Sequence, residues 1–317
     1  MTQSNFSRRG FIAASAGLAA SSMVLGAPRL ARAAAPIRIG LGSDPVFASF
    51  FLAAHEGFFK DAGLDVNIQT YSGGGEAMNA LVANQVDVAA ASESTTMTRM
   101  PRAEIRPLAV TYSSGLYVKL VLRDGIKDAS EIKTFGVVPG SISEYCTGLT
   151  IQHFGLDATS LKMVPSGPPE LPALLVRGDI DAFFAWEPWP ATAVAQGGHV
   201  LLTSRDVGYT DTIWATSSAA MLESNPERLQ AMLGALAKAS EIVQSDPERA
   251  AQGVKAITRI PVETTLTAFK DMTAVVRDFT DADYESFDGI AKFLAANGGS
   301  EGEIPWRDTM QRGFYKG

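Results

Sequence analysis

The sequence contains only one cysteine, Cys146, and three histidines among its 317 residues. A single cysteine excludes an intramolecular disulfide, so a hydrophobic core must stabilise the fold without covalent help. The histidines lack the spacing of metal ligands, and no zinc-protease, phosphate-loop or nucleophile-elbow motif is present. We therefore predict no metal, no cofactor and no catalytic residue, and a protein that is not an enzyme.

Cys146 itself has two interpretations. It falls early in a predicted helix, where the helix dipole can lower the pKa of a thiol and make it reactive. No partner histidine is indicated by the sequence, so a buried structural thiol is the favoured interpretation.

Positive charge is also scarce, since 27 lysines and arginines face 34 aspartates and glutamates, a net charge of −7. Four of the arginines and none of the acids fall in residues 1–33, so the rest of the chain has 23 basic against 34 acidic residues, or −11. A surface of this sign repels phosphate backbones and anionic lipid headgroups. We expect no nucleic-acid partner and no insertion into a membrane.

A long uninterrupted apolar run is missing near the start of the chain. Arg8 and Arg9 precede a mildly apolar stretch at residues 13–25 that serines and a glycine interrupt, whereas a transmembrane helix needs about 20 continuous apolar residues. An Ala-Arg-Ala sequence at residues 31–33 completes the order of an export signal, and paired arginines are typical of the twin-arginine pathway. We predict that residues 1–33 are a twin-arginine signal peptide and that the mature protein is periplasmic.

Beyond this segment, short apolar runs with strand character alternate with helical patterns. Strands are expected at residues 37–41, 64–70 and 86–91, with helices at residues 49–62 and 76–83 between them. This order predicts an α/β fold whose largely parallel sheets bind ligands at the carboxyl ends of their strands.

An internal repeat relates two parts of the chain. Residues 71–93 align with residues 165–187 and share a Ser-Gly turn, a glutamate in the first helical turn, a Leu-Val core pair and an aspartate before the next strand. The two copies end in Glu93 and Glu187. The repeat predicts two similar α/β lobes; chance similarity between two ordinary β-α-β segments is the alternative.

Five loops that follow predicted strands are rich in small hydrogen-bonding residues. Most of them lead into helices, whose exposed N–H groups can bind a sulfonate, carboxylate or nitrate group. Ordinary helix capping is the alternative for any one loop. The candidate ligand-binding residues in these loops are Ser43, Asp44, Ser72, Gly73, Ser92, Glu93, Ser94, Ser141, Ser143, Trp186 and Glu187.

Acidic residues among these candidates bear on the charge of the ligand. Asp44, Glu93 and Glu187 repel a purely anionic ligand, whereas a zwitterion satisfies both the carboxylates and the helix starts. An aminosulfonate such as taurine, or a protonated amino-heterocycle, could place its amine near Glu187 and its chain or ring near Trp186, Trp189 or Tyr112. Packing between the lobes is the alternative role of Trp186 and Trp189.

Three segments carry a resemblance to a known family: residues 53–66, residues 80–87, and residues 177–182, which run on into Trp186-Glu187-Pro188. Together they resemble the substrate-binding proteins of nitrate, sulfonate and taurine ABC importers, a family that also includes binders of thiamine-type pyrimidines. The resemblance spans essentially the whole mature chain. These segments are specific for the family and not for its ligand.

The resemblance implies a two-lobed, type II periplasmic-binding-protein fold, in which each lobe is a mostly parallel sheet flanked by helices and the ligand cleft lies between the lobes. The chain would cross between lobes near residues 112–114 and 213–216. Lobe 1 would then hold residues 36–112, lobe 2 residues 113–213, and residues 214–317 would return to lobe 1 with the C-terminal helices. Such lobes close on ligand by a hinge motion.

The resemblance further implies capture of a small organosulfonate or related polar anion or zwitterion, and its transient delivery to the inner-membrane permease of an ABC importer. The family pattern adds Tyr112 and Ser113 to the candidate contacts, and we expect a monomer. The alternatives are a thiamine-precursor pyrimidine or other amino-heterocycle, nitrate, or a role as a periplasmic sensor. A pyrimidine-synthesising enzyme of the same superfamily is disfavoured, because those enzymes carry a cysteine-rich segment and this chain has only Cys146.

Overall fold

A computed structural model describes residues 35–297 and 304–317. The predicted signal peptide, residues 1–33, lies outside these ranges. Residues 35–317 form one compact unit. A search of the helices within the described ranges finds none that is both long and apolar enough to cross a membrane.

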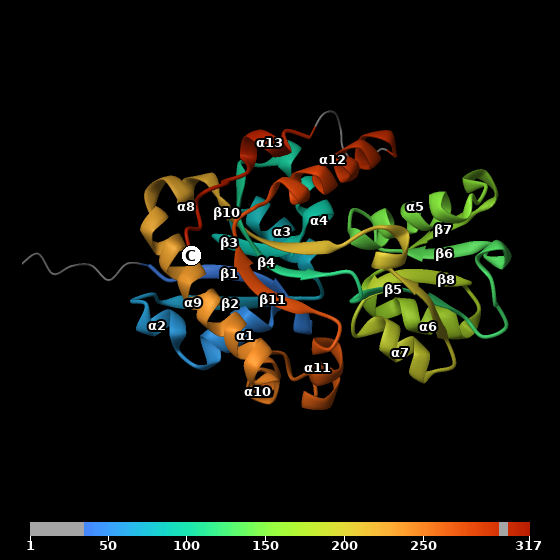
Figure 1. The fold of residues 1–317 in the computed structure, drawn as a ribbon, viewed down its shortest axis with the longest axis horizontal. Helices are drawn as coiled ribbons and strands as arrows, with labels where there is room; N and C mark the ends of the chain where they lie inside the picture. The colour runs from blue at the N-terminus through green and yellow to red at the C-terminus, as the bar shows by residue number, and fades with distance from the viewer. Residues whose placement is uncertain (1–34, 298–303) are drawn as a thin grey trace, which may run out of the picture. The chain divides into compact units, whose positions relative to one another are not determined.

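Two β-sheets organise this unit (Figure 1). The six-stranded sheet has the order β11-β4-β10-β3-β1-β2 and the five-stranded sheet the order β7-β6-β8-β5-β9. The strands of the six-stranded sheet are β1 Ile37–Gly42, β2 Val66–Tyr71, β3 Val88–Ser92, β4 Ile105–Ser114, β10 Asp211–Ser218 and β11 Thr273–Arg277. The strands of the five-stranded sheet are β5 Val118–Leu122, β6 Thr134–Val137, β7 Lys162–Pro165, β8 Ala182–Trp186 and β9 His199–Thr203. We call the parts built on these sheets the first and second lobes.

The helices of the first lobe come from both ends of the chain (Figure 1). They are α1 Ala48–His55, α2 Phe58–Asp61, α3 Gly74–Val82, α4 Glu93–Met97, α8 Ala219–Ser224, α9 Pro226–Ser245, α10 Pro247–Thr258, α11 Val262–Phe269, α12 Asp281–Ala296 and α13 Trp306–Thr309. Those of the second lobe are α5 Ile142–Phe154, α6 Leu171–Arg177 and α7 Trp189–Ala195. Short 3-10 turns occur at η1 Pro45–Phe47, η2 Met100–Arg102, η3 Ala129–Glu131, η4 Ala158–Ser160, η5 Pro168–Glu170 and η6 Ser204–Val207.

Both sheets are mixed, so the prediction of mostly parallel sheets is wrong. β1 pairs in parallel with β2 and β3, and β6 pairs in parallel with β7 and β8. β10 is antiparallel to β3 and β4, β11 to β4, and β5 to β8 and β9. The reason is that β4 carries the chain out of the first lobe and β10 brings it back, so these neighbours run in opposite directions.

The predicted repeat corresponds to matching elements of the two lobes. Residues 71–93 form the end of β2, helix α3 and strand β3, and residues 165–187 form the end of β7, helix α6 and strand β8. The strand orders β2-β1-β3 and β7-β6-β8 are equivalent, and each continues into an antiparallel strand, β10 or β5. Two similar α/β lobes are therefore confirmed.

Two segments of the chain cross between the lobes. β4 continues to Ser114 and β10 begins at Asp211, so the residues just inside the predicted second lobe, 113–114 and 211–213, pair in the sheet of the first lobe. The chain passes to the second lobe between β4 and β5 and returns between β9 and β10. Two short segments therefore link the sheets.

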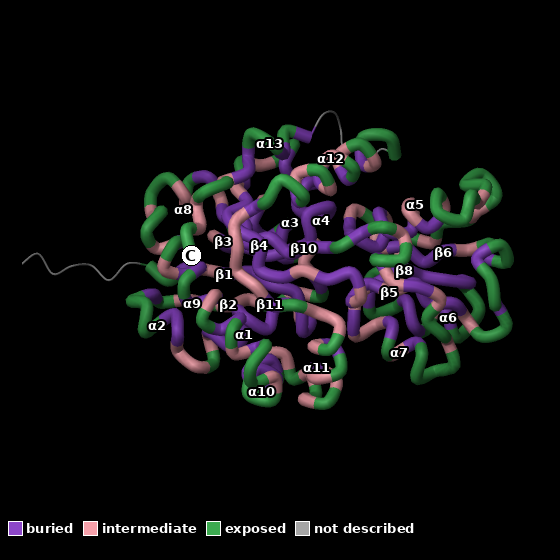
Figure 2. Tube along the Cα trace, viewed as in Figure 1, coloured by how far each residue is buried: buried purple, intermediate pink, exposed green. Residues whose placement is uncertain are grey.

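The core follows the strands of both sheets, which Figure 2 shows as buried along most of their length while the outer helices present exposed faces. In the first lobe, α9 and α10 pack on α1, where Phe50 and Phe51 are almost completely buried. Burying each such side chain contributes roughly 1.5–3 kcal/mol. This packing holds the strand ends that build the cavity described next.

Candidate functional site

A cavity of about 410 Å³ lies between the two lobes. Its walls come from the loops that follow β1, β2 and β3 on one side and β6, β7 and β8 on the other. These are the carboxyl ends of the parallel strands, where α/β sheets bind ligands. The volume is within the range of about 300–1,000 Å³ that is typical of small-molecule sites.

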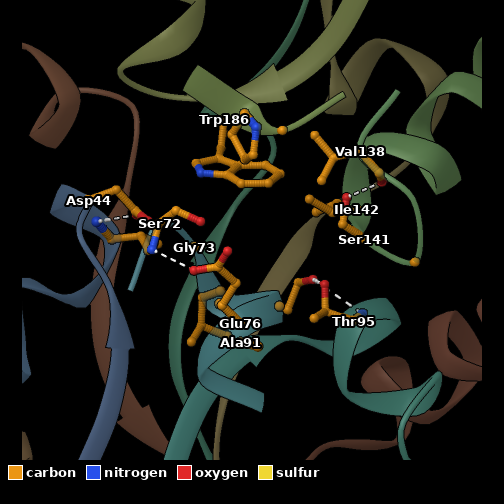
Figure 3. A pocket seen from close by; sticks show the side chains of 18 of the residues that line it. Asp44, Ser72, Gly73, Glu76, Ala91, Thr95, Val138, Ser141, Ile142 and Trp186 are labelled. Carbon is orange, nitrogen blue, oxygen red and sulfur yellow. Dashed lines mark hydrogen bonds between the residues drawn. The ribbon is translucent and has the colours of Figure 1, made fainter. Parts of the chain in front are cut away.

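Six of the thirteen predicted ligand-binding residues line this cavity, namely Asp44, Ser72, Gly73, Ser92, Ser141 and Trp186. Figure 3 shows the Trp186 indole across the cavity from Glu76 and Ala91. The other seven do not line it, namely Ser43, Glu93, Ser94, Tyr112, Ser113, Ser143 and Glu187. Direct contact of the six with a ligand stays a prediction.

The first lobe contributes the glycine-rich start of α3. Gly73 precedes the helix and offers no side-chain cap, so within the described chain the first N–H groups of α3 are not capped by their N-cap residue. A Cβ at Gly74 would lie 3.0 Å from the Cβ of Ala91, so glycine is needed for the close approach of α3 to β3. The N–H of Ser72 donates to Oε2 of Glu76 at 3.1 Å, which anchors that carboxylate at the turn.

The second lobe contributes the start of α5. The Ser141 hydroxyl donates to the carbonyl oxygen of Val138 at 2.7 Å and accepts from the Ser143 N–H at 3.1 Å, which caps the helix. The hydroxyl of Ser143 accepts from the Val138 N–H at 3.2 Å. Ser143 therefore shapes the loop from a buried position, and Ser141 is the serine that reaches the cavity.

Arg99 also lines the cavity, and sequence reasoning missed it. Its Nε donates to Oδ1 of Asn79 at 3.2 Å, and its Nη1 donates to the carbonyl oxygens of Thr95 at 3.2 Å and Gly140 at 2.6 Å. Burial, followed by the charge of Arg102, lowers the pKa of Arg99, but arginine stays protonated in proteins. None of its hydrogen-bond partners in the described chain is a carboxylate. Arg99 therefore brings a positive charge to the cavity and links the two lobes.

Two buried carboxyl groups reach the cavity from the first lobe. Asp44 was predicted, and burial raises its pKa to about 7 despite a hydrogen bond from the Val46 N–H. Asp211, the first residue of β10, was missed; burial and then the charge of Glu93 raise its pKa well above the usual range. The sequence signal for Asp211 was weak, because a single aspartate at a strand start is ordinary.

Glu93 and Glu187 have structural partners instead of a place in the cavity wall. Both carboxylate oxygens of Glu93 accept from the Thr212 N–H at 3.2 Å, and burial raises the pKa of Glu93 to about 7. Oε1 of Glu187 accepts from Lys119 Nζ at 2.6 Å, and Oε2 from the Ala191 N–H at 3.0 Å. The carboxylate predicted to bind a ligand amine is thus occupied by a lysine of the chain itself.

The remaining candidates are also away from the cavity wall. Tyr112 is buried and packs edge-on against Tyr117, with ring centroids 5.6 Å apart. Cys146 is fully buried, and burial raises the pKa of its thiol well above the usual range. The predicted burial of the Cys146 side chain is confirmed.

Proteins similar to this chain have been characterised. The taurine-binding periplasmic protein of Escherichia coli (strain K12) is 23% identical over 198 residues, which cover 60% of this chain and 61% of that protein, less than two thirds of its length. The alkanesulfonate-binding protein SsuA of Xanthomonas axonopodis pv. citri, bound to MOPS, superposes with a TM-score of 0.78 at 15% identity over 88% of this chain and 100% of that one. The aliphatic sulphonate binding protein SsuA of Escherichia coli superposes with a TM-score of 0.77 at 16% identity, over 89% of this chain and 94% of that one.

These similarities confirm the predicted periplasmic-binding-protein fold. Most of the similar proteins are binding proteins, but the enzyme DszB shares the fold. Its cysteine-to-serine variant in complex with biphenyl-2-sulfinic acid has a TM-score of 0.62 at 16% identity, over 88% of this chain and 98% of that one. The fold by itself therefore does not separate binding from catalysis.

Family membership comes from the sequence match. The profile of the NMT1-like family covers residues 31–258, which include both strands that cross between the lobes and every residue that lines the cavity. The predicted relationship to periplasmic sulfonate-, taurine- and nitrate-binding proteins agrees with this match. The chain belongs to the NMT1-like family.

Proposed function

We propose that this chain is a periplasmic solute-binding protein that captures a small polar organic molecule with an anionic head, of the organosulfonate type, and delivers it to an ABC importer. The similarity to taurine- and alkanesulfonate-binding proteins supports this assignment. The observation that carries it is Arg99, a cation that has no carboxylate partner among the described residues and that lies at the wall of a cavity between two lobes.

Arg99 suits an anionic head because Nη2 of its guanidinium, which has no hydrogen-bond partner among the described residues, can donate charge-assisted N–H bonds to a sulfonate or carboxylate. The starts of α3 and α5 flank the same cavity and add N–H groups and partial positive charge. Capture between two lobes allows release when they open.

A second candidate ligand is an amino-heterocycle such as a thiamine-type pyrimidine. The observation that favours it is the Trp186 indole, which faces the cavity and offers a stacking surface (Figure 3). This ligand would use the same cleft and the same delivery route.

Thermal-shift screening with taurine, alkanesulfonates, nitrate and pyrimidines tests the ligand class. A ligand at 100 times its Kd stabilises the folded protein by about 2.7 kcal/mol, which is readily measured. Stabilisation by a sulfonate is the expected result. Stabilisation by pyrimidines alone would replace the first candidate with the second.

The role of Arg99 is tested by Arg99→Ala, with the neighbouring exposed Arg102→Ala as the matched control. Loss of a charged hydrogen-bonding pair costs about 2 kcal/mol, so we expect roughly 30-fold weaker sulfonate binding in calorimetry for Arg99→Ala and no change for the control. Equal affinity in both variants would contradict the proposal. Delivery is tested by comparing the uptake of labelled ligand in cells that carry the wild-type protein and in cells that carry Arg99→Ala. We expect uptake only in the first.

A further inference from the structure

We infer that Asp44 and Asp211 form a second subsite in the cavity, which binds a nitrogen group of the ligand that donates N–H bonds, above all a protonated amine. The inference rests on the proposed function, because it concerns the same cavity and narrows its ligand class. It replaces Glu187, the residue that sequence reasoning assigned to this role.

The two carboxyl groups lie at one edge of the six-stranded sheet. Asp44 follows the end of β1, and Asp211 begins β10, which pairs with β3 next to β1. Both aspartates line the cavity together with Tyr117. Burial, followed by the charges of Asp44, Glu187 and Asp211, raises the pKa of the Tyr117 hydroxyl. The Tyr117 hydroxyl donates to the carbonyl oxygen of Glu187 at 3.2 Å, so its proton is not available to either aspartate.

Neither carboxyl group has enough donors within the described chain. Asp44 is 4% exposed, and the hydrogen bond to its side chain is a long one, from the Val46 N–H to Oδ1 at 3.3 Å. Asp211 is 2% exposed, and its Oδ1 has no hydrogen-bond partner among the described residues. The Tyr112 hydroxyl likewise has no hydrogen-bond partner among the described residues.

No lysine or arginine of the described chain forms an ion pair with either aspartate. Lys119, which follows the lining residue Val118 in β5, is held by Glu187 and Asp271, each at 2.6 Å. Buried carboxyl groups without donors are unfavourable, because desolvation of the charged form is not offset. Since both groups face the cavity, a ligand that donates N–H bonds offsets this cost and is selected.

The cavity is polar at two opposite places. Figure 3 shows Asp44 and Ser72 on one side and Thr95 and Ser141 on the other. Arg99 donates to the carbonyl oxygens of Thr95 and Gly140, so it belongs to the second side. A ligand with an anionic group at Arg99 and an amine at Asp44 fits this arrangement better than a simple anion, which leaves both aspartates without a donor.

Matched ligand pairs test the inference. Calorimetry would compare taurine with ethanesulfonate, and 4-amino-2-methylpyrimidine with 2-methylpyrimidine, on wild type, Asp44→Asn, Asp211→Asn and the exposed control Asp61→Asn. We expect the amino member of a pair to bind at least tenfold more tightly to the wild type. Asp44→Asn and Asp211→Asn should remove this preference, because asparagine keeps the shape of aspartate but cannot carry its charge. In Asp44→Asn the side-chain oxygen can still accept from the Val46 N–H. Asp61→Asn should keep the preference.

The outcomes separate this inference from the proposed function. Equal binding of taurine and ethanesulfonate, or equal losses for both in Asp44→Asn, would overturn the inference and leave the sulfonate proposal standing. Binding of the aminopyrimidine alone, with its preference lost in the two variants, would overturn the sulfonate proposal and support the inference. Absence of binding by all four compounds would overturn both.

Discussion

The two copies of the repeat end in the same residue, yet Glu93 and Glu187 have opposite electrostatic surroundings. Glu93 is completely buried, has no cationic partner in the described chain, and has a pKa of about 7. Glu187 is also buried but forms an ion pair with Lys119 of β5. The partners come from strands outside the repeat, β10 for Glu93 and β5 for Glu187, so a repeated residue type does not imply a repeated charge state.

Other positions of the repeat keep the same role in both lobes. Asp87 forms an ion pair with Arg38 and also accepts from its N–H at 2.9 Å. Asp181 forms an ion pair with Arg123 and accepts from the N–H groups of Lys133 and Thr134. Each aspartate thereby joins the middle strand of its repeated trio, β1 or β6, to the strand that follows the repeated helix, β3 or β8. Asp87 and Asp181 therefore have equivalent structural roles in the two copies, whereas Glu93 and Glu187, which end the copies, have different ones.

The largest expected effect comes from removing the partner of Glu187. Lys119→Met leaves a buried carboxylate unpaired and also breaks the contact of Lys119 with Asp271. Loss of one member of a buried pair costs about 4 kcal/mol in free energy of unfolding, measured by urea denaturation. Lys60→Met, at an exposed position, is the control. Adding Glu187→Gln to Lys119→Met should restore part of the loss; a cost near zero for Lys119→Met would show that the pair contributes nothing.

The next effect depends on pH and concerns Glu93. Burial raises its pKa from 4.5 to about 7, so between these values the folded state binds more protons than the unfolded state, and stability falls as pH rises. Glu93→Gln removes this contribution. The variant should match the wild type near pH 4.5 and be more stable by about 3 kcal/mol above pH 7.

Denaturation from pH 4.5 to 8.5 measures this difference, and Glu187→Gln provides the contrast. Glu187→Gln should destabilise the protein at neutral pH, because it removes an ion pair instead of a buried charge without a counterion. The same sign of change for both variants at pH 8 would contradict the distinction between the two copies.

The smallest effect concerns the equivalent aspartates. Asp87→Ala and Asp181→Ala each remove charge-assisted hydrogen bonds, and each should cost about 2 kcal/mol in free energy of unfolding. The exposed pair of Arg177 and Asp179 supplies the control, since Asp179→Ala should change stability by less than about 0.5 kcal/mol. A cost for only one of the first two variants would show that the copies differ here as well.

Much of the fold could be predicted because its signals are local. The strands and helices between residues 37 and 92 lie within a few residues of their predicted ranges, apart from the break at Gly57 that divides one predicted helix into α1 and α2. Gly57 has φ +78°, a conformation that favours glycine and ends the first helix. The repeat predicted the second lobe from equally local signals, because the hydrophobic periodicity and the turn residues of each copy involve neighbouring positions in the sequence.

The site was predicted in part. Loops after strands placed Asp44, Ser72, Gly73, Ser92, Ser141 and Trp186 among the candidates, because the carboxyl ends of parallel strands meet at one edge. Sequence reasoning missed Arg99 and Asp211, whose access to the cavity depends on how α4 and β10 are placed against other elements. It also assigned Glu187 to a ligand, although Lys119, 68 residues away, occupies it.

The sequence by itself determined the order of strands and helices, the two similar lobes and the edges at which ligand loops gather, because periodicity and turn residues act over a few neighbouring positions. Only the tertiary structure decided the antiparallel strands that make both sheets mixed, the positive charge of Arg99 in the cavity and the different surroundings of Glu93 and Glu187. These depend on pairs as distant as Glu93 and Thr212, 119 residues apart. Burial and the identity of the partner set the charge of a carboxyl group, and both are properties of the folded chain.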